Sequence, residues 1–425
     1  MRNQFTSAFF AGLLSVFIGC QVGDAQTVVI DSAGIRIVES AAPAWGDDGW
    51  TVSDTPTVVI GRMEGDERYL FGEVAGALML RDGRIAVLDG QSALIRVYSS
   101  EGEHIADWGG QGEGPGEFTH PQRIFPYRGD SILVSEFVAR RLTVFDDEGR
   151  VGRSMVPQMR VSFATDLRSL LSEGELSMTP AESCCRMWGP LANGAFLLSY
   201  PEMIPETGSG TRRGTVSAAI TPDSGGAPVA AGEFEGRRRR YGVGGSRTGY
   251  QFQPWFNMAA GRKGYYATQG DSYSINAYDP EGHLVRIIRL AREPRPVTDE
   301  VKAAHKERLS ERILAPGAPL EGGSPEKILE GMLSRPYPSH LPTFFQLLTD
   351  PEGNLWAGQR RYGTSADAQG PDVIEHFVFG SDGRHLGVVE LPANFRVFQI
   401  GADFILGSVW DELDVQYVHL YGIEK

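Results

Sequence analysis

The sequence predicts an all-β fold, a six-bladed β-propeller with a small helical insertion before its fifth repeat. The first observation behind this prediction is a phrase, a tight polar turn followed by a short apolar strand, that occurs six times. The second is its spacing, because the shortest gaps match the ~40–50 residues of one four-stranded blade. The residues that mark the strand of each phrase are Ile85, Ile132, Phe196, Tyr266, Leu355 and Phe404.

Further strands are predicted on both sides of each phrase. Before the phrase we expect the innermost strand of a blade, at 71–75, 120–124, 253–257, 341–345 and 395–398. After it, alternating apolar residues and a glycine turn predict an outer hairpin, as at 95–102 and 142–149. The third blade is the least regular, with a strand at 216–220 and a turn at 223–226.

Both ends of the chain are expected to close the ring. The sixth blade has a third strand at 415–421 and then reaches Lys425, so its outer strand is expected from the N-terminal segment 34–38. Closure of this kind removes a sheet edge. We therefore predict one domain over 27–425, a single six-bladed propeller closed by N- and C-terminal strands.

The helical insertion is predicted at about 298–335. Apolar residues at helical spacing follow Thr298, a suitable N-cap, and Pro325 stands at the first position of a second short helix. These helices are expected to cap one face of the disc or to decorate its rim.

Composition and charge are typical of a soluble globular protein. Hydrophobic residues make up 41% of the chain and charged residues 22%. The net charge of −14 disfavours binding to nucleic acid or to an anionic membrane surface. We expect no nucleic-acid partner and a monomeric protein.

Residues 1–19 are predicted to be a signal peptide. Arg2 supplies positive charge, and 8–18 form an apolar run too short to span a bilayer. Residues 17–20 resemble a bacterial lipobox, in which Cys20 would be lipidated, and ordinary cleavage near residue 25 is the alternative. Both predict export, as a periplasmic protein or as an outer-membrane lipoprotein that contacts the membrane only through its lipid anchor at Cys20.

The other cysteines, Cys184 and Cys185, are adjacent in the sequence. A disulfide between them would be strained, because neighbouring Cα atoms lie ~3.8 Å apart. We interpret them as two small residues near a blade edge, with a bridge formed in an oxidising compartment as the alternative.

The glycine-rich run at 109–118 matches no phosphate-loop spacing and precedes a strand rather than a helix. We interpret it as a connection between blades that Phe118 anchors. With His120-Pro121 and the turn-strand phrase that follow, it resembles bacterial six-bladed propellers of the NHL-like and TolB-like kind, and 31–38 resembles the start of uncharacterised exported members. The resemblance implies the fold but no activity, since such propellers include binding modules, scaffolds, lactonases and lyases.

Related gluconolactonase-like enzymes hold a metal in the axial channel with Glu, Asn and Asp side chains. The plausible oxygen ligands on the predicted innermost strands of this chain are Glu73 and Asn257. They are the candidates for a calcium or zinc site, while our preferred interpretation has no cofactor and assigns no catalytic residue.

Five residues are predicted to line the channel that a ligand would enter: His120, Arg123, Phe256, His340 and Phe344. Aromatic side chains at such positions can instead pack blade against blade, and a histidine there can satisfy a backbone group or serve as a general base. The run at 237–240, four consecutive arginines, is expected to be a solvated loop.

Two functions of different classes remain. We favour an exported, non-enzymatic propeller that binds a small ligand, a glycan or an envelope protein on its loop face. The alternative is an axial-channel enzyme, either a metal-dependent lactonase-like hydrolase or a lyase.

Overall fold

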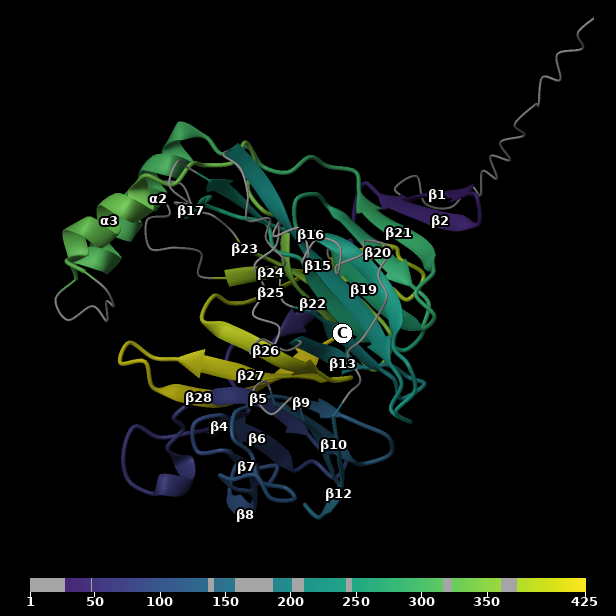
Figure 1. Cartoon of the computed structure of the whole chain (residues 1–425), viewed down its shortest axis with the longest axis vertical. Helices are drawn as coiled ribbons and strands as arrows, with labels where there is room; N and C mark the ends of the chain where they lie inside the picture. The colour runs from purple at the N-terminus through teal and green to yellow at the C-terminus, as the bar shows by residue number, and fades with distance from the viewer. Residues whose placement is uncertain are drawn as a thin grey trace, which may run out of the picture.

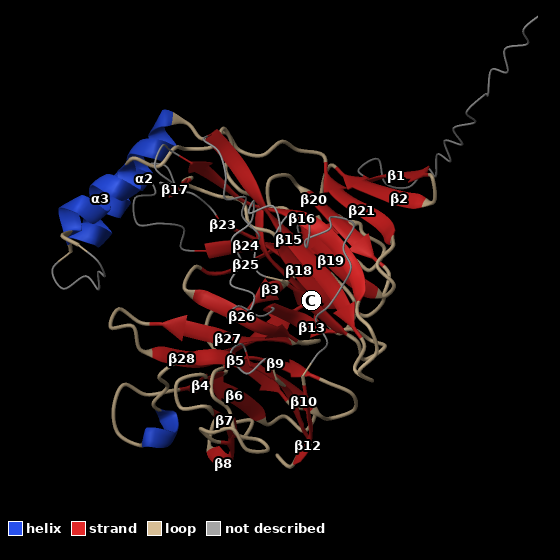
Figure 2. Cartoon of the chain, in the orientation of Figure 1, coloured by secondary structure: helices blue, strands red, loops and turns tan. Residues whose placement is uncertain are grey.

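The computed structural model describes residues 27–46, 48–136, 141–156, 186–200, 210–241, 247–315, 323–360 and 373–425. The strands of these residues form six sheets (Figure 1), and strands dominate the described chain (Figure 2). The first sheet contains β5 (Val74–Met79), β6 (Ile85–Asp89), β7 (Leu94–Tyr98) and β8 (His104–Gly109). The second contains β9 (Pro121–Pro126), β10 (Ile132–Glu136), β11 (Leu142–Phe145) and β12 (Val151–Met155).

The third and fourth sheets are larger. The third contains β13 (Arg186–Pro190), β14 (Phe196–Ser199), β15 (Gly210–Thr221), β16 (Val229–Tyr241) and β17 (Arg247–Gly249). The fourth contains β18 (Asn257–Gly261), β19 (Gly264–Thr268), β20 (Ser274–Tyr278) and β21 (Leu284–Leu290), followed by β2 (Ile35–Ser40) and β1 (Thr27–Ser32).

The last two sheets complete the ring. The fifth contains β22 (Phe344–Thr349), β23 (Leu355–Arg360), β24 (Val373–Phe379) and β25 (His385–Pro392). The sixth contains β26 (Phe395–Ile400), β27 (Phe404–Trp410) and β28 (Gln416–Glu424), and β28 also pairs with β3 (Thr51–Val52) and β4 (Val58–Ile60).

The first strand of each sheet contacts the first strand of the next, and β26 contacts β5. The hydrophobic cores repeat this order, because each of the six clusters draws its residues mainly from two consecutive sheets. The cluster between the sixth and first sheets, which includes Leu406 and Val87, closes the circle. The predicted all-β propeller is confirmed. The count of six blades stays a prediction, which the six sheets of the described residues support.

The repeated turn explains why the fold could be predicted from the sequence. Gly83 and Gly353 occupy equivalent turns with φ of 88°, a conformation that favours glycine. The apolar strands that follow them begin at Ile85 and Leu355, both fully buried. Phe118 is also fully buried and exchanges backbone hydrogen bonds with Gly110 and Gly112, so it anchors the glycine-rich connection as predicted.

The strand predicted to close the ring was wrongly assigned. β2 pairs in parallel with β21 and extends the fourth sheet, whereas β3 and β4 pair with β28. Packing explains the choice, because Ile60 of β4 is buried with Leu406 and Val418 between the sixth and first sheets. Four of the five predicted innermost strands also begin one to four residues later than expected, at β5, β9, β18 and β22.

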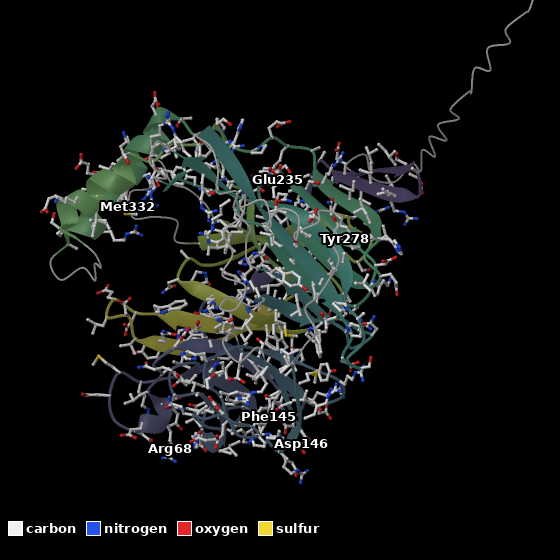
Figure 3. The ribbon with its side chains drawn as sticks, in the orientation of Figure 1. Arg68, Phe145, Asp146, Glu235, Tyr278 and Met332 are labelled. Carbon is white, nitrogen blue, oxygen red and sulfur yellow. The ribbon has the colours of Figure 1, made fainter. Side chains whose placement is uncertain are left out.

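Two helices form the predicted insertion, α2 (Asp299–Leu314) and α3 (Pro325–Leu333). Thr298 accepts a hydrogen bond from the Val301 N–H and caps α2, and Ser324 caps α3. The insertion contacts the segment between β17 and β18, where Gln251 Nε2 donates to the carbonyl of Met332 on α3 at 2.6 Å. Met332 is labelled in Figure 3. None of the helices in the described part of the chain is long and apolar enough to cross a membrane.

Two further predictions concern the remaining segments. The arginine run at 237–240 is not a loop, because it belongs to β16, which pairs with β15 as far as Tyr241. The predicted signal peptide, Cys20, Cys184 and Cys185 lie outside the described residues.

Candidate functional site

A cavity of about 1020 Å³ lies where the six innermost strands face one another. Each of these strands contributes to its wall, so the cavity occupies the axis of the ring. Its lining includes Ala75 from β5, Arg123 from β9, Trp188 from β13, Asn257 from β18, Phe345 from β22 and Arg396 from β26.

Amide side chains in this wall join neighbouring sheets. Asn257 Nδ2 donates to the Phe345 carbonyl at 2.7 Å, and its Oδ1 accepts from the Leu347 N–H at 3.1 Å. Gln346 Nε2 donates to the carbonyl of Val397 at 3.2 Å. These side chains satisfy backbone groups of adjacent innermost strands and thereby stabilise the ring.

Three arginines of the wall differ from these amides. Arg123, Arg186 and Arg396, which we call the strand arginines, lie on β9, β13 and β26. The Arg186 guanidinium carbon lies 4.2 Å from the ring centroid of Trp188, and that of Arg123 lies 5.9 Å from it. Arg396 lies 5.1 Å from the Phe398 centroid. Guanidinium groups near aromatic faces keep their N–H donors available for an oxyanion.

The strand arginines gather positive charge without a carboxylate in direct contact. Among the described residues none of the three has an ion-pair or hydrogen-bond partner. Burial, and then the charges of Arg186 and Arg396, lower the pKa of Arg123 to about 9. Burial and the Arg396 charge lower the pKa of Arg186. Burial lowers the pKa of Arg396 as well, although the charge of Glu73 acts in the opposite direction. Three cations held this way favour an anion between them.

Three other arginines line the same cavity and are paired. Arg81, Arg128 and Arg262 follow the ends of β5, β9 and β18, and we call them the turn arginines. Their partners are Asp130 for Arg81 and Asp223 for Arg128, each at 2.8 Å, and the Pro351 carbonyl for Arg262 at 2.9 Å.

The predicted site residues are only partly brought together. Arg123 and Asn257 line the cavity. Glu73 is exposed just before β5 and is not part of the cavity wall, although its charge acts on Arg396. His120 and His340 are exposed outside the wall, and His340 Nδ1 shares a hydrogen bond with Ser339 Oγ at 2.9 Å.

The two predicted aromatic residues belong to the cores between sheets. Phe344 is fully buried, and its neighbour Phe345 lines the cavity instead. Phe256 stacks on Phe234 with ring centroids 4.4 Å apart and contacts Trp188 edge-on. In the part of the chain that the structure describes, no three His, Cys, Asp or Glu side chains are grouped so that they could hold a metal ion.

Sequence reasoning missed Arg186, Arg396 and Trp188. Arg396 lies in the predicted strand 395–398, and alternation along that strand would have placed Arg396 and Phe398 on the face opposite the buried Phe395 and Val397. Arg186 and Trp188 gave no such signal, because β13 lies in the irregular third repeat and its strand was not predicted.

No family model and no curated protein matches the chain, whereas many solved structures resemble it. A member of the DUF4221 family from Bacteroides vulgatus has a TM-score of 0.47 and 12% identity, over 88% of this chain and 99% of its own. A candidate exported protein of Bacteroides fragilis has a TM-score of 0.42 and 10% identity, over 91% and 98%. Virginiamycin B lyase from Staphylococcus aureus has a TM-score of 0.37 and 8% identity, over 89% and 100%. At such identities and TM-scores below 0.5, these likenesses carry no argument about what this chain binds.

Proposed function

We propose that this chain is an exported binding protein whose axial cavity takes a small organic anion bearing a carboxylate or phosphate group. The observation that carries the proposal is the convergence of three strand arginines, from β9, β13 and β26, whose side chains have no ion pair or hydrogen bond among the described residues. Charge-assisted hydrogen bonds from guanidinium groups to oxyanions are among the strongest polar contacts in proteins.

The surroundings of the arginines indicate the rest of the ligand. Trp188, Phe345 and Phe398 lie in the same wall, so the cavity combines cationic donors with aromatic surface. An anion with an apolar or sugar-like body would contact both kinds of group. Inorganic phosphate or sulfate would use the donors alone.

The charge of the wall supports binding rather than the metal-dependent alternative. Among the described residues that line the cavity there is no Asp, Glu or His. The positive potential of the strand arginines would repel a divalent cation, and the described lining holds no carboxylate or imidazole that could act as a general base. The proposed site therefore binds its ligand and leaves it unchanged.

Titration of the purified protein with galacturonate and with galactose tests the proposal. The two sugars differ by one carboxylate, so galacturonate should bind and raise the melting temperature, whereas galactose should not. Arg186→Gln should weaken galacturonate binding by about tenfold or more, because it removes a charge-assisted bond. Arg81→Gln removes an equal charge from the same cavity and should change the affinity by less than about threefold.

Two results would overturn the proposal. One is that galactose binds as tightly as galacturonate, while two further anions titrated in the same way, phosphate and citrate, do not bind. The other is an equal loss on Arg186→Gln and Arg81→Gln, which would mean that only the overall charge matters.

A further inference from the structure

The strand arginines occupy equivalent positions in their sheets. Each pairs with a buried serine of the second strand, and each serine stands three residues after a fully buried Ile or Phe near the start of that strand. The same spacing from Ile85, Tyr265 and Leu355 gives the equivalent position in the other three sheets. The six positions, which we call the axial layer, all line the cavity: Gly76, Arg123, Arg186, Asn257, Gln346 and Arg396.

Contacts between neighbouring innermost strands show that these positions lie at one level of the channel. The Asn257 side chain bonds to the backbone of both residues that flank Gln346. The Gln346 side chain bonds to the carbonyl of the residue after Arg396. A Cβ added to Gly76 would lie 2.9 Å from Cγ2 of Ile124, the residue that follows the strand arginine of β9. The side chains of the axial layer therefore surround the axis at the same depth.

The axial layer is divided into a neutral arc and a cationic arc. The neutral arc is Asn257 and Gln346, whose amides are bonded to the wall. The cationic arc lies on β26, β5, β9 and β13, which follow one another around the axis (Figure 1). Gly76 brings no side chain to this arc, and the contact with Ile124 excludes even an alanine there. The arc is therefore open at β5.

This opening separates the arginines into two groups. Arg123 and Arg186 lie on adjacent innermost strands, and both guanidinium groups lie beside the ring of Trp188. Arg396 lies on the other side of the glycine, beside Phe398. The cationic arc thus offers donors at two places rather than at one.

The charges of the arc act on one another. Beyond the effect of burial, the pKa of Arg123 is lowered by Arg186 and Arg396, and the pKa of Arg186 is lowered by Arg396. Glu73 is the only acidic residue of the described chain whose charge acts on any of these three groups. Three positive charges and one negative charge leave an excess of two positive charges.

We propose that the axial layer binds a small organic dicarboxylate, with one carboxylate at Arg123 and Arg186 and the other at Arg396. The inference rests on the proposed function and narrows its ligand class. Two carboxylates match the excess charge of the arc, and each receives charge-assisted hydrogen bonds. The opening at Gly76 leaves room for the body of the ligand between them. A single phosphate group would carry the same charge at one point and reach only one of the two arginine groups.

Titration of the full-length protein with glucarate and gluconate tests the inference, because these two open-chain sugar acids differ by one terminal carboxylate. Glucarate should bind about tenfold more tightly or better, since its second carboxylate adds a charge-assisted bond. Arg396→Gln should reduce this preference to about threefold or less, because that carboxylate then has no guanidinium partner. Glucose 6-phosphate carries both charges on one group and should bind more weakly than glucarate.

Arg262→Gln is the matched control. It removes one charge from the same cavity at a turn arginine that is already bonded, so the preference for glucarate should stay within about twofold of the wild-type value. The preference compares two ligands on the same variant, so a loss of folded protein alone does not change it. Melting temperatures show in addition that each variant is folded.

Galacturonate, the probe of the proposed function, is titrated beside the other ligands. If galacturonate binds and glucarate and gluconate bind equally well, the dicarboxylate inference is wrong and the anion site stands. An equal loss of preference in Arg262→Gln and Arg396→Gln also overturns the inference, because the overall charge alone then sets the preference. Tighter binding of glucose 6-phosphate than of glucarate overturns it in favour of a phosphate ester. If none of the three sugar acids binds, the proposed function fails as well.

Discussion

The strand arginines and the turn arginines line one cavity and differ in what they contact. Each turn arginine is held by a carboxylate or a carbonyl of a neighbouring turn. The strand arginines stand beside aromatic rings with no such partner in the described chain. Residue type and location in the channel are therefore poor guides to function. What distinguishes the two sets is whether the guanidinium has a partner. An arginine with a partner joins two blades, and an arginine without one is available to a ligand.

A buried polar or charged group without a partner costs stability. The amides of the wall show the usual solution, because Asn257 satisfies backbone groups of β22 with both ends of its side chain. The strand arginines depart from this pattern, and the binding site that we propose rests on that departure.

The largest predicted effect concerns a partnerless group outside the cavity wall, His376 on β24. It is 1% exposed, and neither ring nitrogen has a hydrogen-bond partner among the described residues. Burial lowers the pKa of His376 to about 4, from 6.5 in the unfolded chain. The unfolded state therefore binds more protons between these values, so the stabilising contribution is complete above pH 6.5 and is lost as the pH falls towards 4. The loss is about 3 kcal/mol.

Urea unfolding at pH 7 and pH 4 checks this value. His376→Leu should remove about 3 kcal/mol of the pH dependence. The same change at the exposed His340 should leave that dependence as in the wild type. If His376→Leu unfolds with the wild-type pH dependence, an unpartnered buried group does not carry the cost that the comparison assumes.

The second effect compares the two arginine sets directly. Arg123→Gln with Arg396→Gln, and Arg81→Gln with Arg262→Gln, remove the same charge from the same cavity. The first pair should weaken galacturonate binding by about 100-fold, or about 2.8 kcal/mol. The second should change it by less than about threefold, because its arginines already have partners. Isothermal titration at constant salt gives both values, and equal losses would erase the distinction between the sets.

The sequence predicted the repeats better than the site, for a physical reason. Gly83 and Gly353 mark their turns because few other residues adopt their φ, and Thr298 marks a helix start because its hydroxyl caps the backbone. Such signals are local and do not depend on the rest of the fold. They located the strands that follow each turn and both helices of the insertion.

The direction of a side chain from a strand has no local signal. A shift of one residue moves a side chain to the other face, so Phe344 was predicted for the channel although Phe345 lines it. Gathering Arg123, Arg186 and Arg396 also requires knowing which strands face the axis. One of those strands, β13, was not predicted at all.

The third effect tests the role of Asn257, which the sequence offered as a metal ligand. Its amide bonds to the Phe345 carbonyl and the Leu347 N–H, so Asn257→Ala leaves a buried N–H without an acceptor. We expect a loss of about 2 kcal/mol in the free energy of unfolding. Thr349→Val, which removes the single bond to the Ala260 carbonyl, should cost about 1 kcal/mol. A calcium- or zinc-dependent melting temperature that disappears in Asn257→Ala would instead support the metal site.

The smallest effect is a change in the free energy of unfolding that has opposite signs for the strand arginines and the turn arginines. Without ligand, Arg123→Gln removes a partly buried cation that Arg186 and Arg396 repel, so the free energy of unfolding should rise by about 1 kcal/mol after solvent screening. Arg128→Gln breaks the ion pair with Asp223. Because the Arg128 side chain is 56% exposed, this change should lower the free energy of unfolding by only about 0.5 kcal/mol. Both differences should shrink in high salt, because screening weakens repulsion and attraction alike.

With saturating galacturonate, the wild-type protein should become more stable than Arg123→Gln, since only the wild-type strand arginines then gain a partner. If Arg123→Gln instead lowers the free energy of unfolding of the ligand-free protein, Arg123 already makes a stabilising interaction there. The distinction between the strand arginines and the turn arginines would then be wrong.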